Sequence, residues 1–199
     1  MHDRDHQLEP ARQRIRAVYD PAQFTALGHL VADELGRHLA SVQAGAGPVL
    51  NWADPHQLVE MATSSREHPA ATDVRQHVQT LVREALARGI NLHHPRYVGH
   101  QVPASMPVAA LFDLVGSVTN QVMAIYEMGP WASAVEKSLL AAVGEQLGFA
   151  KDRFAGLVTS GGSLANLTAI LTARNVTLGD AWNRGLAGRK PAPVLVAHG

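Results

Sequence analysis

The sequence predicts an α/β protein in which a helical N-terminal arm precedes the first part of a sheet. Short apolar runs at residues 155–159 and 193–197 flank a helical segment, which is the pattern of a strand–helix–strand unit. Between residues 20 and 90, two long segments carry apolar residues at helical spacing. A sheet of two strands cannot bury itself, so we expect the chain to be a truncated part of such a fold.

Composition excludes several classes of protein. The sequence has 17 Lys or Arg and 17 Asp or Glu residues, and this balance argues against a broad basic surface for nucleic acid. Cysteine is absent, which excludes disulfides and thiolate metal sites. The charged start is not a secretory signal, and no stretch reaches the ~18 apolar residues of a membrane span. We therefore expect a soluble, cytoplasmic protein that binds neither nucleic acid nor a membrane.

Two one-sided helices are expected in the N-terminal half. Residues 1–19 are polar, and we expect a flexible N-terminus there. A helix begins at Asp20, which caps it, with Pro21 in the first position; a second begins near Asp73 and ends at Gly89. The apolar stripes need a partner surface, in this chain or in another subunit. They comprise Phe24, Leu27, Val31, Leu35, Leu39 and Val42 in the first helix and Val74, Val78, Leu81, Val82 and Ala85 in the second.

The remaining elements follow from proline, glycine and apolar spacing. Residues 55–61 predict one or two helical turns, and residues 91–107 predict a loop rich in His, Pro and Gly. Helices are expected from about 107 to 120 and from Pro130 to Gly148.

The segment Thr159–Asn166 carries the most specific pattern, TSGGSLAN, between an expected strand and an expected helix. Glycines allow a sharp turn and a close approach to a ligand, and we expect the hydroxyl of Ser163 to cap the helix. The free N–H groups and the positive end of a helix favour an anion, best a phosphate. A purely structural turn is an equal alternative, because the segment is neither a P-loop nor a dinucleotide fingerprint.

Three blocks, in order along the chain, carry a resemblance to a known family. The first is HPRYVGHQ at residues 94–101, and the second runs from Asn120 to Pro130, where it reads YEMGP, with Glu136 following in the next helix. The third is Thr159–Asn166, continuing to Arg174. Together they resemble the group II pyridoxal-phosphate (PLP) dependent amino-acid decarboxylases, such as the aromatic amino-acid, glutamate and diaminobutyrate decarboxylases, from about residue 20 onward.

The resemblance implies a fold type I PLP enzyme with its active site at a subunit interface. Gly162 and Ser163 match the positions that hold the cofactor phosphate, and Asn166 matches a residue that braces that turn. His100 and Gln101 match positions that face the substrate pocket. An ordinary loop histidine is the alternative for His100.

The same resemblance implies a division of the chain and an activity. After the flexible N-terminus of residues 1–19, residues 20–90 would form an N-terminal helical dimerisation arm and residues 91–199 the first, incomplete part of the PLP-binding large domain. The implied activity is decarboxylation of an L-amino acid, a small-molecule substrate, in a homodimer or in a pairing with a complementary half.

The lysine that holds PLP as a Schiff base in the family has no match in this chain. Lys137 should face solvent on its helix, and Lys151 and Lys190 lie in polar loops. No catalytic residue is therefore assigned, and we expect the chain alone to be inactive.

Other candidate residues are given structural interpretations. His93, His94 and His100 share one loop, but no carboxylate lies at ligand spacing, so we expect no metal site. His94, before a proline, is interpreted as structural. Glu136 lies opposite the apolar stripe of its helix and is interpreted as solvated or paired across an interface, not as catalytic.

Two alternative functions stay open. An aminotransferase or another fold type I enzyme would share the phosphate turn but not the block at residues 94–101. A non-catalytic remnant that dimerises, or that binds a full-length paralogue through its helical arm, would explain the missing lysine.

Overall fold

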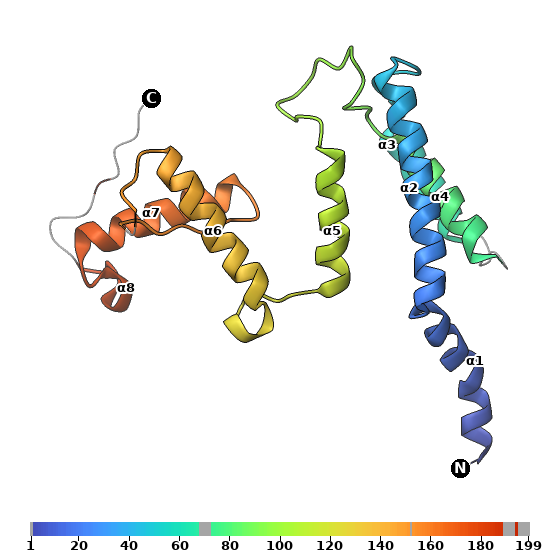
Figure 1. Cartoon of the computed structure of the whole chain (residues 1–199), viewed down its shortest axis with the longest axis horizontal. Helices are drawn as coiled ribbons and strands as arrows, with labels where there is room; N and C mark the ends of the chain where they lie inside the picture. Colours follow the sequence, from blue (N-terminus) through green and yellow to red (C-terminus); the bar gives the residue numbers. More distant parts are fainter. Residues whose placement is uncertain (1, 68–72, 152, 189–193, 195–199) are drawn as a thin grey trace. The chain divides into compact units, whose positions relative to one another are not determined.

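The computed structural model describes residues 2–67, 73–151, 153–188 and 194 (Figure 1). It divides into two compact units, Met1–Leu114 and Val115–Gly199, each considered by itself. The division lies within α5, later than the boundary expected near residue 90, and the predicted roles of the parts stay predictions. The helices in the described ranges are α1 (His2–Val18), α2 (Pro21–Gln43), α3 (Pro55–Glu67), α4 (Val74–Arg88), α5 (Pro107–Thr119), the 3-10 helix η1 (Tyr126–Met128), α6 (Pro130–Gln146), α7 (Gly162–Leu178) and α8 (Ala181–Arg184).

Aspartate caps determine where α2 and α4 begin. Asp20 Oδ1 accepts from the N–H of Ala22 at 3.0 Å, and Asp73 Oδ1 accepts from the N–H of Arg75 at 2.9 Å. Each bond satisfies an N–H that the helix itself leaves free. Gly89 follows α4 as its C-cap. The expected starts of both helices and the expected end of the second at Gly89 are confirmed.

A buried carboxylate joins α2 to α4, which lie side by side in Figure 1. Glu34 is only 7% exposed. It accepts from Gln79 Nε2 at 2.6 Å and from Arg83 Nε and Nη2 at 3.0 and 2.8 Å, and Arg37 Nη2 lies 3.0 Å away. The contact between the two helices is therefore charged as well as apolar.

The predicted apolar stripes are covered only in part. Val42 of the predicted α2 stripe is buried, whereas Phe24 and Leu35 of that stripe stay exposed. Leu30, which the predicted stripe did not include, is buried as well. No residue of α4 is classed as buried within the described part of the chain. The stripes thus retain exposed apolar side chains.

The segment that follows α2 is hydrogen-bonded to the segment that follows α4. Leu50 and Ile90 form an isolated antiparallel bridge. The buried Asn91 donates from Nδ2 to the Pro48 carbonyl at 2.6 Å, and its N–H donates to the Val49 carbonyl at 2.9 Å. These bonds fix the start of the loop that carries His94 and His100.

The N-terminal segments are more helical than the sequence indicated. Residues 2–18 form α1, in which Glu9 pairs with Arg16 at 3.6 Å. The expected flexibility of residues 1–19 stays a prediction. The helical turns expected at residues 55–61 extend to Glu67 as α3, whose start is stabilised by a bond from the N–H of His56 to Asp54 Oδ1 at 2.9 Å. None of the helices in the described ranges has the length and apolar content of a membrane span.

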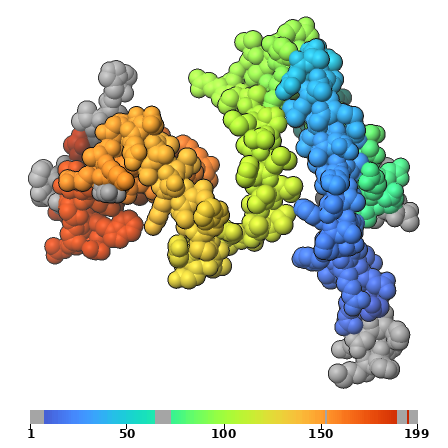
Figure 2. Space-filling view, in the orientation of Figure 1, coloured from blue at the N-terminus to red at the C-terminus, as the bar shows by residue number. Residues whose placement is uncertain are grey.

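Helix α5 is confirmed, and it exposes its apolar side chains. In Figure 2, α5 is the yellow-green column of atoms. The exposed residues on α5 include Val108, Leu111, Phe112, Val115 and Val118.

The expected sheet is not confirmed in the described residues. Residues 155–159 are extended but pair with no neighbouring strand, so the prediction of a strand there is corrected to an extended segment. A strand needs a second backbone to accept its hydrogen bonds, and apolar spacing alone does not supply one. The second expected strand, residues 193–197, lies outside the described residues except for Val194. Helix α8 was not predicted and packs its buried Ala181 near α7.

Candidate functional site

The glycine-rich turn leads directly into α7, as the sequence predicted. Helix α7 begins at Gly162 after the N-cap Gly161, and no side chain caps it. The first intrahelical bond there joins the Ala165 N–H to the Gly161 carbonyl at 3.2 Å. The N–H groups ahead of it have no partner within the helix and lie at its positive end. This arrangement suits a bound anion.

The predicted cap by Ser163 is wrong. The helix begins at Gly162, so Ser163 is already its second residue, whereas a capping side chain belongs to the residue before the helix. The hydroxyl of Thr159 instead donates to the Gly161 carbonyl at 3.0 Å, which forms a hydrogen bond within the turn. Ser163 therefore keeps its hydroxyl available beside the helix start.

The turn also has room for a ligand. A Cβ placed on Gly161 or Gly162 would meet no atom within 4 Å. Asn166 is exposed in the second turn of α7, and in the described contacts its side chain makes no hydrogen bond to the glycine turn. The space and the uncapped helix start fit a phosphate group, while the bracing role of Asn166 stays a prediction.

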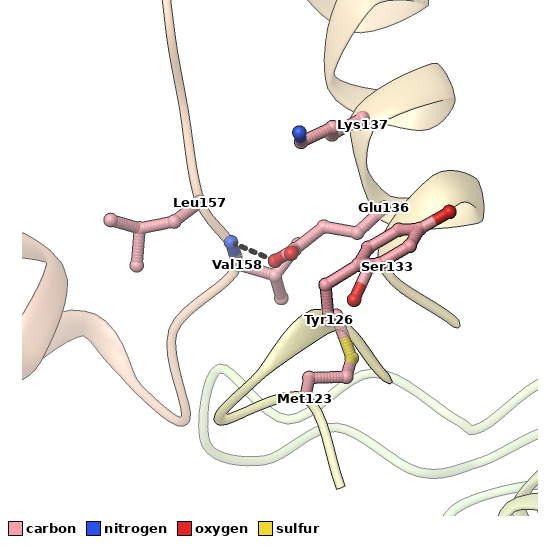
Figure 3. Close-up of a pocket in the computed structure, with 7 residues that line it drawn as sticks. All are labelled: Met123, Tyr126, Ser133, Glu136, Lys137, Leu157 and Val158. Atoms are coloured by element: carbon pink, nitrogen blue, oxygen red, sulfur yellow. Dashed lines mark hydrogen bonds between the residues drawn. The ribbon is translucent and has the colours of Figure 1, made fainter. Parts of the chain in front are cut away.

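An open hollow of about 530 Å³ lies between α6, η1 and the extended segment that precedes the turn (Figure 3). Glu136 reaches across it, and its Oε1 accepts from the Val158 N–H at 2.8 Å. Glu136 was interpreted as solvated or paired across an interface, and the structure instead gives it a backbone partner within its own chain. The hollow is lined by Met123, Tyr126, Ser133, Glu136, Lys137, Leu157 and Val158.

The loop of the first unit carries the predicted substrate residues. His100 and Gln101 are both exposed, and the His100 carbonyl accepts from the Val102 N–H at 2.6 Å. Their exposure leaves them free to meet a ligand, and their role stays a prediction.

His94 has the structural character that the sequence indicated. It is 3% exposed, and its Nδ1 accepts from the Arg96 N–H at 3.1 Å. Its Nε2 is buried without a hydrogen-bond partner among the described residues. His93 Nε2 lies 2.8 Å from the Ser105 carbonyl. No group of three potential metal ligands occurs in the described ranges.

The structure brings Gly162, Ser163 and Asn166 together at the start of α7, in the second unit. His100 and Gln101 belong to the first unit. The residue that sequence reasoning missed is Glu136, although the second family block had included it. Its bond is made to a backbone group 22 residues away, which no helical periodicity reveals.

The sequence of this chain is similar to those of known decarboxylases. No family model matches the chain. It is 28% identical over 109 residues to an L-2,4-diaminobutyrate decarboxylase of Acinetobacter baumannii, covering 55% of this chain and 21% of that protein. It is 25% identical over 119 residues to an L-aspartate decarboxylase of Metarhizium robertsii, covering 60% and 24%.

Solved structures give a longer match. Mouse CSAD matches with a TM-score of 0.72 and 21% identity, over 85% of this chain and 35% of that one. The glutamate decarboxylase domain of a Vibrio parahaemolyticus protein, diaminobutyrate-pyruvate transaminase and L-2,4-diaminobutyrate decarboxylase, matches with a TM-score of 0.65 and 18% identity, over 86% and 36%.

The structural matches show the class of fold: the chain has the fold of part of a fold type I PLP-dependent enzyme. The relatives and solved structures named above are group II PLP-dependent decarboxylases, and the resemblance of this chain to the N-terminal portion of that family is confirmed. The matched residues span less than a quarter of the curated relatives, at 21% and 24% of their lengths.

Proposed function

We propose that this chain is the N-terminal portion of a PLP-dependent carboxy-lyase that acts on an L-amino acid. The observation that carries the proposal is the uncapped start of α7, which follows the glycine turn in a chain with the fold of decarboxylases. The curated relatives decarboxylate diaminobutyrate and aspartate, which suggests a small polar amino acid as the substrate.

The residues of this chain would bind and orient the cofactor. The N–H groups of Gly162 and Ser163, with the Ser163 hydroxyl, would hold the phosphate of PLP, and Asn166 would brace the turn. His100 and Gln101 would contact the substrate. Bound PLP supplies the electron-accepting ring that decarboxylation requires.

The two lysines in the described part of the chain do not suit the role of cofactor anchor, and the third, Lys190, lies outside the described residues. Lys137 is exposed on α6, and Lys151 is exposed in the turn that follows it. A lysine that holds PLP is activated by a desolvated or cationic setting, which an exposed side chain lacks. We therefore propose that the anchor lies outside residues 1–199 and that these residues alone are inactive.

Exposed apolar side chains support the proposal that the chain pairs with a second copy or with a complementary half. The exposed apolar residues of α2 and α5 are those that a second copy, or a complementary half, would cover. A non-catalytic remnant that binds through its helical arm would use the same surface. Carbon dioxide release by the native protein distinguishes the decarboxylase from such a remnant.

The proposal is tested by carbon dioxide release. The 199-residue chain with added PLP should give none, whereas the protein isolated from its own cells should release it from an amino acid such as L-2,4-diaminobutyrate or L-aspartate. Release by the 199 residues alone would contradict the missing anchor. If the native protein transferred amino groups to a 2-oxo acid, it would be an aminotransferase; if it did neither reaction, it would be a non-catalytic remnant.

A further inference from the structure

The extended segment before the glycine turn lies along one face of α6. A Cβ on Gly156 would lie 3.2 Å from Leu140 Cδ2, so the segment is close to that helix. The buried Gly144 lies against the ring of Phe154, which occupies the place of a side chain there. Glu136 accepts from the Val158 N–H at 2.8 Å.

These three contacts follow a common register. Along α6 the contact residues are spaced by four, which places them on one face and about 6 Å apart along the axis. Along the segment they are spaced by two, about 6.6 Å apart in an extended chain, and they run in the opposite direction. The two spacings agree, so the segment runs antiparallel to α6 with matched contacts at 136 and 158, 140 and 156, and 144 and 154.

Only one of the three contacts is a hydrogen bond, and it is the one nearest the turn. The apolar contacts of Leu140 and Gly144 are non-directional, whereas the Glu136 bond holds one specific N–H. Val158 directly precedes Thr159, whose hydroxyl donates to the Gly161 carbonyl at 3.0 Å. The bond between Glu136 and Val158, which Figure 3 shows, holds residue 158 to α6. The bond made by the next residue, Thr159, then joins the segment to the N-cap of α7.

We infer that Glu136 is a positioning residue that holds the phosphate-binding turn at the start of α7 in its binding conformation. The inference rests on the proposed function. The role requires an acceptor oxygen for the Val158 N–H, and a side-chain amide supplies one as a carboxylate does. A glutamine, which keeps the oxygen without the charge, should therefore replace Glu136.

The test uses the full 199-residue chain and pyridoxine 5′-phosphate, which has the ring and phosphate of PLP without the reactive aldehyde. Glu136→Ala should lower the affinity by about two- to tenfold, as expected for one lost hydrogen bond, and Glu136→Gln should keep it. Glu145→Ala is the matched control, since Glu145 is an exposed glutamate of the same helix. Hydrogen exchange of the Val158 amide should quicken in Glu136→Ala only.

The outcomes separate this inference from the proposed function. Wild-type affinity in Glu136→Ala would overturn the positioning role while the phosphate site stood. Equal losses in Glu136→Ala and Glu136→Gln would overturn the role of the acceptor oxygen. No binding by the wild-type chain would remove the phosphate site, and the positioning role with it. Circular dichroism of each variant identifies a loss that comes from unfolding.

Discussion

Substitution of Gly162 by Asp should lower the affinity of the chain for phosphate on the order of tenfold or more, without weakening α7. Gly162 is the first residue of the helix, and a Cβ there meets no atom within 4 Å. A carboxylate at a helix N-terminus stabilises the helix by roughly 0.3–1 kcal/mol. It would also occupy the N–H groups that the phosphate needs and repel the anion.

The measurement is a titration with inorganic phosphate, with the helical signal followed by circular dichroism. Gly36→Asp adds the same charge at an uncrowded position of α2 and should bind phosphate as the wild type does. Ser163→Ala, which removes one hydroxyl, should cost about two- to tenfold. A folded Gly162→Asp variant with unchanged affinity would show that phosphate does not bind at the start of α7.

The contact between α2 and α4 should weaken in acid. Hydrogen bonds from Arg83, then from Gln79 and Arg37, lower the pKa of Glu34 from 4.5 to about 2, against the opposing effect of its burial. The folded pKa lies below the unfolded value, so the ionised carboxylate stabilises the folded state at all pH values above about 4.5. That stabilisation is lost progressively as the pH falls from about 4.5 to about 2.

Glu34→Gln should reproduce the acid state at neutral pH. The amide keeps the shape of the side chain but cannot attract both guanidinium groups, so the melting temperature should fall at pH 7 and the variant should lose this part of the pH dependence. Asp33→Asn removes an exposed carboxylate from the same helix and should behave as the wild type. If the melting temperature of Glu34→Gln fell with decreasing pH in parallel with that of the wild type, the role of Glu34 would be contradicted.

The sequence predicted what short-range chemistry determines. Asp20 and Asp73 marked helix starts because a cap is made within a few residues, and Gly89 marked an end for the same reason. The glycine turn before α7 was likewise predicted, since glycines, a following helix and the family block coincide there.

The failures concern contacts between distant residues. The segment 155–159 has the composition of a strand, but its partner in the described residues is the face of α6 and not another strand. Glu34 lies among the apolar positions of α2, and its partners Gln79 and Arg83 are 45 and 49 residues away. A carboxylate on a buried face, with arginine on the next helix, was the signal that could have predicted this pair.

The central claim is that residues 1–199 supply the phosphate site of a PLP-dependent decarboxylase whose anchoring lysine lies elsewhere. Its most direct test is borohydride reduction of the protein isolated from its own cells, with no PLP added, followed by peptide mass spectrometry. We predict that the pyridoxyl group is attached to a lysine outside these 199 residues. A label on Lys137, Lys151 or Lys190, or a native protein that carries no PLP, would contradict the claim.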